Sequence, residues 1–290
     1  MFCCLACHAP LDETNFSARS QCPGCQLTIE NVDGIPLLVR DRQVIEGTIA
    51  EARRQGLDAW YTKPQLGQWV GPYRHHVRKR KKWVEGVLAE RKLRHDRQPT
   101  VGLDLGCGDG SNLQWLHLHF ARLYGSDYNL LRLLRAASLG INARLFMADI
   151  CEYPVKDDCF DVIFFNHVLE HIPDDAAALR EVRRILKPGG LLILGVPNEG
   201  AAFWQLAYRL QPNTRATSDH QHFYTADSVA AQCKAAGLTV QKIHPIGWGV
   251  PHWTLDALIR RFKWVDDGLE MLGRRFLPGQ ATSLYLQLSK

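Results

Sequence analysis

Residues 100–111, TVGLDLGCGDGS, run from a short apolar strand into a glycine-rich turn. The next segment, NLQWLHLHF at 112–120, has the apolar spacing of a helix. Glycines at 106, 108 and 110 let the backbone approach a ligand at the N-terminus of that helix. A strand, a glycine turn and a helix in this order predict a parallel α/β sheet that binds a nucleotide-like cofactor.

Two details of the turn decide between dinucleotides and S-adenosylmethionine. Ser111 stands where a dinucleotide fingerprint would place its third glycine, and Asp104 precedes the first glycine by two residues. A carboxylate near a pyrophosphate is unfavourable, whereas a carboxylate near the ammonium group of a methionine moiety is favourable. The D-x-G-x-G-x-G pattern therefore predicts S-adenosylmethionine as the cofactor.

Further strands and helices alternate along the chain after this turn. This alternation predicts a Rossmann-like, doubly wound α/β sheet of seven strands with right-handed crossovers, and its last strand is expected to be antiparallel. A helix is expected at 174–186 and a basic helix at 73–97. The predicted strands after the first are 121–127, 143–149, 160–166, the LLILGVPN stretch after Gly190, 238–246 and 281–289.

Acidic residues close two of these strands at positions that suit a nucleoside. Asp127 follows Gly106 by 21 residues, which is the expected place for a carboxylate that accepts both ribose hydroxyls. Asp149 and Ile150 end the third strand and suit the amino group and the ring face of adenine.

The segments "LDLGCGDG", "FNHVLEHIPD", "LKPGG" and "HFYT…AAGL" resemble, in order and spacing, the class I S-adenosylmethionine-dependent methyltransferases over residues 100–245. The nearest resemblance is to the small-molecule branch that includes the ubiquinone and menaquinone biosynthesis enzymes. The resemblance implies a cofactor site in which each part of the ligand has its own residues. These are Asp104, Gly106 and Gly108 for the methionine end, Asp127 for the ribose, Asp149 with Ile150 for the adenine, and Asn166 beside the sulfonium. Tyr128 is a further predicted cofactor-binding residue.

Nine cysteines are present, and five of them fall within the first 25 residues. Cys4 and Cys7 form one CxxC knuckle, and Cys22 and Cys25 form a second one after a gap of fourteen residues. Two such turns supply the four corners of a tetrahedral zinc site, and four thiolates leave no position for a catalytic water. The spacing predicts a structural zinc ion, with the neighbouring Cys3 and His8 as substitutes for one ligand.

The stretch "DGIPLL" at 33–38 follows the second knuckle, and Pro10-Leu11 follows the first. Together they resemble the zinc-ribbon family of small activators of tRNA and protein methyltransferases, which implies a docking or stabilising module. The predicted organisation is a zinc ribbon at 1–40, a linker and helical extension at 41–99, and a class I methyltransferase domain at 100–290.

The net charge of +5 is concentrated in one place. Residues 70–97 hold ten lysines and arginines against three acidic residues, so the remaining chain is slightly acidic. The chain lacks any apolar run near the roughly 18 residues of a membrane span. Its start lacks the basic and apolar regions of a signal peptide. These features predict a cytoplasmic protein.

Histidines are the candidates for removing a proton from the methyl acceptor. We expect His171, after the fourth strand, and His222 in SDHQHFY at 218–224 to be the catalytic residues. His220 is a further candidate, and Asp219 is placed to orient either histidine of that loop. Aromatic-rich insertions at 199–224 and 248–280 are expected to bind the acceptor, with the basic helix as a third wall.

Three functions compete at this stage. The leading hypothesis is methylation of a small molecule, at oxygen. The second is methylation of RNA, because the zinc ribbon and the run RHHVRKRKK at 74–82 could dock a nucleic acid. The third is a binding protein that keeps the fold without catalysis. A pattern for flipped bases is missing, since His167-Val168 follows Asn166 in place of two prolines and an aromatic residue.

Overall fold

The computed structural model describes residues 1–12, 19–40, 66–95, 101–216 and 219–290, together with Gln43, Glu46, Ala50 and Arg54. Of the linker and helical extension predicted at 41–99, only 66–95 and these four residues are described, and the rest lies outside the described residues. Within them, no helix combines the length and the apolar character that crossing a membrane requires.

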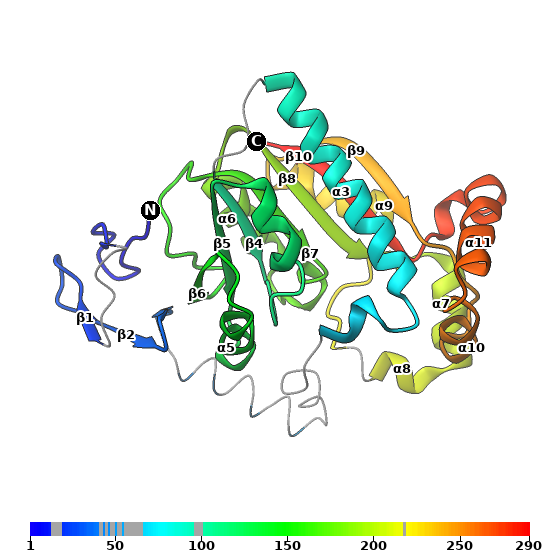
Figure 1. Cartoon of the computed structure of the whole chain (residues 1–290), viewed down its shortest axis with the longest axis horizontal. Helices are drawn as coiled ribbons and strands as arrows, with labels where there is room; N and C mark the ends of the chain where they lie inside the picture. Colours follow the sequence, from blue (N-terminus) through cyan, green and yellow to red (C-terminus); the bar gives the residue numbers. More distant parts are fainter. Residues whose placement is uncertain are drawn as a thin grey trace.

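A single sheet of ten strands forms the centre of the molecule, in the order β1-β2-β3-β6-β5-β4-β7-β8-β10-β9 (Figure 1). Seven of these strands, β6-β5-β4-β7-β8-β10-β9 in sheet order, correspond to the seven predicted strands. The stretch from β6 to β8 is parallel, and the last strand of the chain, β10, pairs antiparallel with both of its neighbours. The strands are β1 (Arg19–Gln21), β2 (Thr28–Val32), β3 (Ile35–Leu38), β4 (Val101–Leu105), β5 (Arg122–Asp127), β6 (Arg144–Ala148), β7 (Phe160–Asn166), β8 (Leu186–Pro197), β9 (Thr239–Ile246) and β10 (Ser283–Ser289).

The strand count differs from the expected seven because the N-terminal region adds three strands to the same sheet. β3 pairs in parallel with β6, with Leu37 opposite Met147 and Leu38 opposite Ala148. A β-bridge also joins Phe2 to Val155. The unpaired edge of β6 would otherwise expose its backbone groups, and β3 supplies their partners. The described residues of the N-terminal region, 1–12 and 19–40, therefore pack as part of the sheet, and the domain boundary at residue 40 stays a prediction from the sequence.

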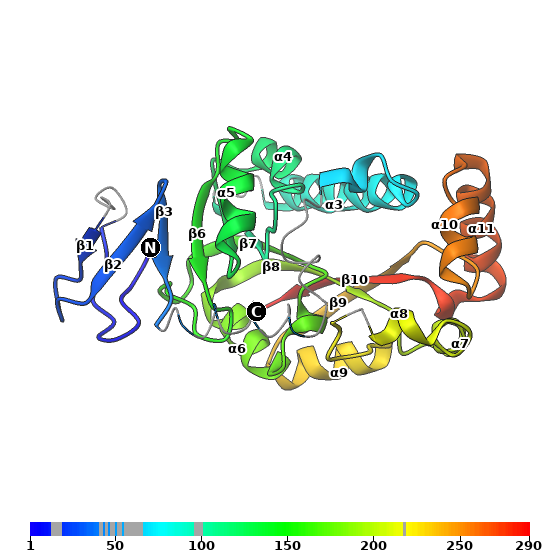
Figure 2. The same cartoon turned by 90° about the horizontal axis from the view of Figure 1, so that it is seen from below.

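Helices cover both faces of the sheet, and Figure 2 shows α3, α4 and α5 on one side with α6 and α9 on the other. The α-helices are α3 (Arg74–His95), α4 (Leu113–Leu116), α5 (Leu130–Ser138), α6 (Asp175–Ile185), α7 (Ala202–Leu210), α8 (Pro212–Ala216), α9 (Ala226–Ala235), α10 (Trp253–Ile259) and α11 (Lys263–Phe276). The 3-10 helices are η1 (Leu66–Trp69), η2 (His117–His119), η3 (Leu169–His171) and η4 (Pro278–Gln280). This doubly wound arrangement confirms the predicted fold class.

The central strands are buried on both faces, which explains their continuous apolar runs. All five residues of β4 are buried, including Asp104. One core lies under α6 and α9 and contains Tyr124 and Phe160, whereas the other lies under α3, α4 and α5 and contains Trp115 and Phe164. The N-terminal residue Phe2 belongs to the first core, where its ring lies 4.8 Å from the ring of Phe146.

Candidate active site

A cavity of about 890 Å³ opens at the carboxyl ends of β4, β5, β6 and β7. Ligands of open parallel sheets bind at this edge, and the volume is within the usual range for a small-molecule site. One half of the cavity is lined by the turns that follow these strands. The other half is lined by residues of α3, α7 and α10 and by the loop around His220. The two halves are called the cofactor half and the acceptor half below.

The glycine turn forms the floor of the cofactor half. Gly106 and Gly108 have φ values of +73° and +54°, which residues with a side chain rarely adopt. A Cβ atom on Gly106 would lie 2.4 Å from a methyl carbon of Val168. The Gly106 and Cys107 amides donate to the Ser126 carbonyl at 2.8 and 2.9 Å, so the turn is fixed to the end of β5.

Asp127 and Asp149 follow β5 and β6 and line this half together with Tyr128 and Ile150. The Asp127 carboxylate accepts hydrogen bonds from the amides of Gly108 and Asn129, both at 2.9 Å. The Tyr128 amide is a third backbone donor to this carboxylate. A carboxylate offers about four acceptor sites, so it can still accept from a ligand. Burial raises the pKa of Asp127, and the charge of Arg132 and these backbone donors oppose the increase.

Asp104 lies behind the turn and does not itself line the cavity. Its side chain is 1% exposed, and its Oδ2 atom has no hydrogen-bond partner among the described residues. Burial raises the pKa of the Asp104 carboxyl to about 8, although Arg80 opposes this effect. Arg80 lines the cavity, is itself buried and donates to Asn112 Oδ1 at 2.9 Å. A buried carboxylate without a partner suits a cationic group of a ligand.

Asn166 ends β7 and lines the cavity between the two halves. Its Oδ1 atom is buried and lacks a partner among the described residues. His167 follows with a φ of +53°, and its amide donates to the Gly195 carbonyl at 2.8 Å. This sharp turn directs the chain from the sheet edge into η3, where His171 lies.

The acceptor half contains a histidine and a carboxylate in direct contact. His220 Nδ1 lies 2.6 Å from Glu199 Oε2, and both residues line the cavity. Burial lowers the pKa of the His220 imidazole, but the hydrogen bond to Glu199 and the charge of Glu199 outweigh it, so the pKa is raised. A carboxylate on one ring nitrogen fixes the orientation of the ring and leaves the other nitrogen for a substrate.

His171 also lines the cavity, and its ring lies 4.7 Å from that of His220. Its Nδ1 donates to the Asp219 carbonyl at 3.1 Å. Burial lowers the pKa of His171, although Glu170 opposes this effect. The structure therefore brings together the predicted His171, His220 and Asp219.

The structure places His222 differently from what the sequence suggested. It does not line the cavity, and its Nε2 donates to the Ile172 carbonyl at 3.0 Å. Its backbone amide donates to the Glu170 carbonyl at 3.1 Å, and its ring stacks on Tyr224. In this position His222 anchors the loop that carries His220.

Aromatic side chains from both predicted insertions form the outer wall of the acceptor half. Trp204 of α7 and Trp253 of α10 line the cavity with their rings stacked, 5.3 Å apart. Tyr73, which precedes α3, also lines the cavity, and the Arg260 guanidinium lies 5.3 Å from its ring. Arg260 is buried between Asp256 and Asp266, at 3.4 and 2.8 Å.

The basic run at 74–82 is largely engaged inside the protein. Lys79 pairs with Asp266, Asp267 and Glu270 of α11, and Arg80 faces the cavity. Lys81 pairs with Glu85 at 3.6 Å. Two residues of the run, Arg78 and Lys82, have exposed side chains.

The four predicted zinc ligands form one cluster in the N-terminal region. The sulfur atoms of Cys4, Cys7, Cys22 and Cys25 all lie within 4.8 Å of one another. Cys4 and Cys25 are 3.7 Å apart, and Cys7 and Cys22 are 3.5 Å apart. Zn–S bonds of about 2.3 Å in a tetrahedron place sulfur atoms about 3.8 Å apart.

Each knuckle ends in a residue with positive φ, His8 at 59° and Gln26 at 62°. The two turns are thus built in the same way, as paired metal knuckles are. Cys3 lies outside the cluster.

Two residues that line the cavity, Glu199 and Arg80, are not among the site residues predicted from the sequence. Glu199 follows Asn198 at the end of β8, and this strand-end position was the signal that could have found it. Arg80 is one of many cations in a basic run, and nothing in the run distinguishes it.

Comparison with known proteins agrees with this geometry. A family model described as a methyltransferase domain matches residues 73–243, and the chain belongs to this family. The chain is 28% identical over 176 residues to a ubiquinone biosynthesis O-methyltransferase of Pseudomonas aeruginosa (strain UCBPP-PA14), covering 57% of this chain and 72% of the relative. It is 27% identical over 191 residues to a 2-methyl-6-phytyl-1,4-hydroquinone methyltransferase of Synechocystis sp. (strain ATCC 27184 / PCC 6803 / Kazusa), covering 59% and 58%.

Two solved structures share the fold at low identity. The plantazolicin methyltransferase BamL, in complex with a triazolic desmethylPZN analog and SAH, has a TM-score of 0.53 at 16% identity and covers 85% of this chain and 99% of that one. An S-adenosylmethionine-dependent methyltransferase from Mesorhizobium loti has a TM-score of 0.50 at 18% identity, with 67% and 93% covered. The family match and these relatives support an S-adenosylmethionine-dependent methyltransferase, which sets aside a non-catalytic binding protein.

Proposed function

We propose that this enzyme transfers a methyl group from S-adenosylmethionine to a hydroxyl oxygen of a small, apolar acceptor. The observation that carries the proposal is the His220–Glu199 pair, 2.6 Å apart, in the same cavity as the cofactor half. A hydroxyl becomes a nucleophile when a positioned base accepts its proton. The quinone-pathway O-methyltransferase among the relatives supports oxygen as the methylated atom.

The cofactor half has the donors and acceptors that S-adenosylmethionine requires. Asp104 would neutralise the ammonium, and the buried Arg80 beside it would pair with the carboxylate of the methionine end. Asp127 would accept a hydrogen bond from the ribose, beside Tyr128. Asp149 and Ile150 would hold the adenine. When bound, S-adenosylmethionine supplies an electrophilic methyl group.

In the acceptor half, His220 is the proposed base and Glu199 is its positioning residue. The carboxylate stabilises the protonated ring, which makes His220 a stronger base than burial alone would allow. His171 packs edge-on against His220 and limits its rotation. Trp204 and Trp253 would hold an apolar acceptor with its hydroxyl toward this pair.

A small molecule is favoured over RNA as the acceptor because several cations of the basic run at 74–82 contact other parts of the protein. Lys79 forms ion pairs with α11, and Arg80 is part of the cavity wall. Arg78 and Lys82 are the exposed cations of the run. A stable RNA complex needs several phosphate contacts, because each contact contributes separately to the salt-dependent affinity.

His220→Gln tests the proposed base, with His222→Gln as a matched control from the same loop but outside the cavity. Formation of S-adenosylhomocysteine would be followed by mass spectrometry with a panel of phenols and hydroquinones. We expect His220→Gln to lower kcat by about 10²–10⁴-fold, the usual contribution of a general base. S-adenosylmethionine affinity should stay unchanged in both variants. A full rate in His220→Gln would contradict the assignment, whereas an equal loss in His222→Gln would show that the ordering of the loop, and not the base alone, limits the rate.

We further infer that Cys4, Cys7, Cys22 and Cys25 bind one structural zinc ion, because their sulfur spacing fits a tetrahedral site. Metal analysis of the purified chain should give one zinc equivalent. Cys22→Ser/Cys25→Ser should remove it, whereas Cys233→Ser, which changes a buried cysteine of α9, should retain it. Zinc retained by the double variant would exclude this site.

A further inference from the structure

The helices at one end of the molecule expose an unusual number of apolar side chains. Of fourteen large apolar side chains exposed in the described residues, ten lie on α7, α10, α11 and the residues next to them. Trp264 is 77% exposed, Phe276 is 70% exposed and Met271 is 67% exposed. The ten, called the outer face here, are Leu206, Leu210, Leu255, Leu258, Phe262, Trp264, Met271, Leu272, Phe276 and Leu277.

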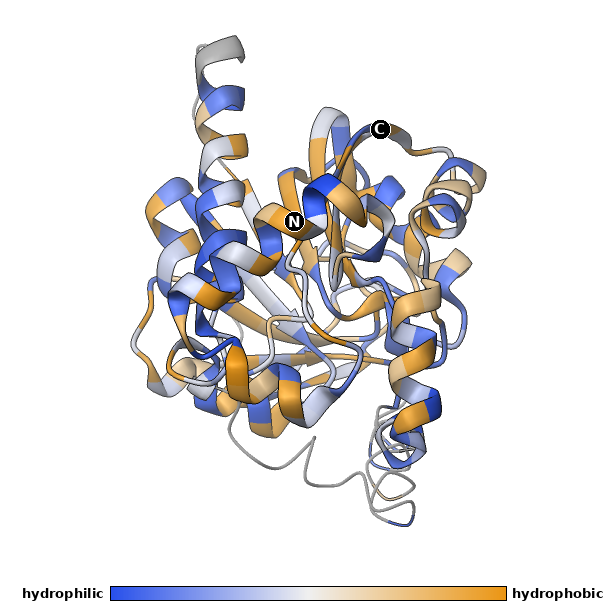
Figure 3. Ribbon diagram, turned by 90° about the vertical axis from the view of Figure 1, so that its right-hand side faces the viewer, coloured by the Kyte–Doolittle hydropathy of each residue, from blue (hydrophilic) through white to orange (hydrophobic). Residues whose placement is uncertain are grey.

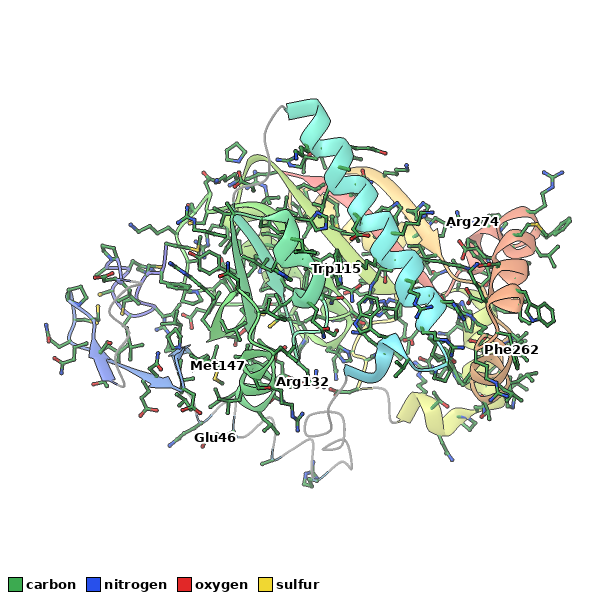
Figure 4. The ribbon with its side chains drawn as sticks, in the orientation of Figure 1. Glu46, Trp115, Arg132, Met147, Phe262 and Arg274 are labelled. Carbon is green, nitrogen blue, oxygen red and sulfur yellow. The ribbon has the colours of Figure 1, made fainter. Side chains whose placement is uncertain are left out.

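These helices lie at the end of the molecule opposite the cysteine cluster (Figure 2). Figure 3 looks onto this end, where orange and blue segments alternate along the helices, and Figure 4 labels Phe262 and Arg274 there. Gln211, just after α7, accepts a hydrogen bond from the Trp253 amide at 2.6 Å, so α7 and α10 are neighbours. Arg260 joins the end of α10 to Asp266 of α11. The exposed side chains therefore come from connected helices.

The spacing on α11 separates an inner from an outer side. Trp264 and Met271 are seven residues apart and lie on one line along the helix, and Leu272 and Phe276, four residues apart, lie on the adjoining part of its exposed side. Asp266 and Glu270 point to the other side, where Lys79 of α3 pairs with both. The helix thus fixes its acids inward and presents its largest apolar side chains outward.

Among the described residues, the charges near this exposed side that lack an ion-pair partner are positive. All four acids of α10 and α11 pair with lysines or arginines of the protein. Arg209, Arg261 and Arg275 are exposed near the outer face and pair with no carboxylate of the described residues. Exposed Trp and Phe side chains beside arginines that lack a carboxylate partner complement an anionic lipid surface. The rings enter the boundary between headgroups and acyl chains, and the arginines contact the anionic headgroups. A patch this apolar is uncommon on a face that meets only water.

The same helices also form the wall of the acceptor half. Trp204 of α7 and Trp253 of α10 line the cavity, while Leu206 of α7 and Leu255 of α10 are exposed. We propose that the outer face docks on an anionic lipid bilayer and that the methyl acceptor is a lipophilic molecule taken from that bilayer. The second part rests on the proposed function. Docking would place the aromatic wall of the cavity next to the membrane, so that the acceptor avoids crossing bulk water.

Flotation of the full chain with lipid vesicles tests the docking without an acceptor. Vesicles of equal phosphatidylcholine and phosphatidylglycerol would be compared with vesicles of phosphatidylcholine alone. We expect binding to the anionic vesicles and at least tenfold weaker binding by Trp264→Gln/Phe276→Gln. Leu118→Gln is the matched control, because Leu118 is 71% exposed on η2, outside the outer face. Arg261→Glu/Arg275→Glu should weaken binding to the anionic vesicles in particular.

Light scattering and S-adenosylmethionine calorimetry on the same variants separate the alternatives. All variants should bind the cofactor as the wild type does, because none of these side chains lines the cavity. No vesicle binding by the wild type, or equal binding by Trp264→Gln/Phe276→Gln, would overturn the docking. A dimer that dissociates in that double variant, without vesicle binding, would assign the outer face to a second copy instead. If the wild type does not bind S-adenosylmethionine, the result would count against the proposed function and not against the docking.

Discussion

Replacing Asp104 with asparagine removes the negative charge that we assign to the cofactor's ammonium group while keeping the size of the side chain. Asp104 is 1% exposed, and its Oδ2 atom lacks a partner among the described residues. Because Asp104 lies behind the turn, its effect on the ammonium is an attraction between opposite charges, worth about 1.5–3 kcal/mol at a separation of about 5.5–11 Å and an effective dielectric constant of about 20. Its loss corresponds to about 10–150-fold weaker binding of S-adenosylmethionine. Isothermal titration calorimetry measures this directly. Asp157→Asn is the control, since Asp157 is 70% exposed and outside the cavity.

The same residue should link cofactor binding to pH. Burial raises the pKa of Asp104 to about 8 in the cofactor-free protein, so the carboxyl is largely protonated at neutral pH. An ammonium beside it favours the ionised form, and binding therefore releases a proton. Affinity should rise by about tenfold per pH unit well below pH 8 and level off above it. Calorimetry in buffers of different ionisation enthalpy should detect this proton, which Asp104→Asn should eliminate.

Whereas the affinity for the cofactor should rise with pH, the contribution of Asp104 to the stability of the cofactor-free protein should fall with pH. The folded-state pKa of Asp104 lies above its ordinary value of 3.8, so between these two values the folded state binds more protons than the unfolded state. The contribution of this group to stability therefore falls as pH rises from about 4 to 8. Asp104→Asn should raise Tm at pH 8, by about 2–4 °C for each kcal/mol relieved.

Three results would refute this account of Asp104. They are an unchanged cofactor affinity in Asp104→Asn, no Asp104-dependent proton release, and a Tm at pH 8 that falls in the variant. The last would mean that the ionised carboxylate is already stabilised by the protein, through Arg80.

Three further predictions concern other parts of the molecule. Asp127→Ala should weaken S-adenosylmethionine binding by about 1.5–3 kcal/mol, because charge-assisted bonds to the ribose are lost; unchanged calorimetric affinity would remove Asp127 from the ribose role. In Glu199→Gln the pKa of His220 should fall, because burial then acts without the opposing carboxylate. The acid limb of the kcat/KM profile should move to lower pH, and an unmoved limb would separate Glu199 from the base. Phe2→Ala should destabilise the whole chain by about 3–5 kcal/mol, since Phe2 is 3% exposed in the main core; urea unfolding with the wild-type midpoint would show that the N-terminal region packs independently.

Structural features that depend on short local sequence patterns could be predicted from the residues alone. The glycine turn after β4 and the acids after β5 and β6 lie at fixed offsets from strand ends, and strand ends follow from apolar runs. The four cysteines could be grouped for the same reason, because each CxxC pair is one local turn. The fold class and a candidate cofactor site can therefore be predicted from the linear sequence.

The acceptor half depends on contacts that no local pattern encodes. Glu199 and His220 are 21 residues apart and meet because β8 and the loop after α8 converge at one edge of the sheet. His220 and His222 look equivalent in sequence, but one faces the cavity and the other faces the Ile172 carbonyl. Arg80 turns inward from a run of cations because a buried carboxylate and Asn112 lie on that side.

The joining of the N-terminal strands to the sheet also follows only from the tertiary structure. A zinc-ribbon pattern followed by a linker suggests an appendage, yet β3 pairs with β6 and Phe2 enters the core. Strand pairing and core packing depend on which surfaces meet once the chain is folded. A local sequence pattern predicts that a strand or a side chain is apolar, but it does not indicate which distant segment will pack against it.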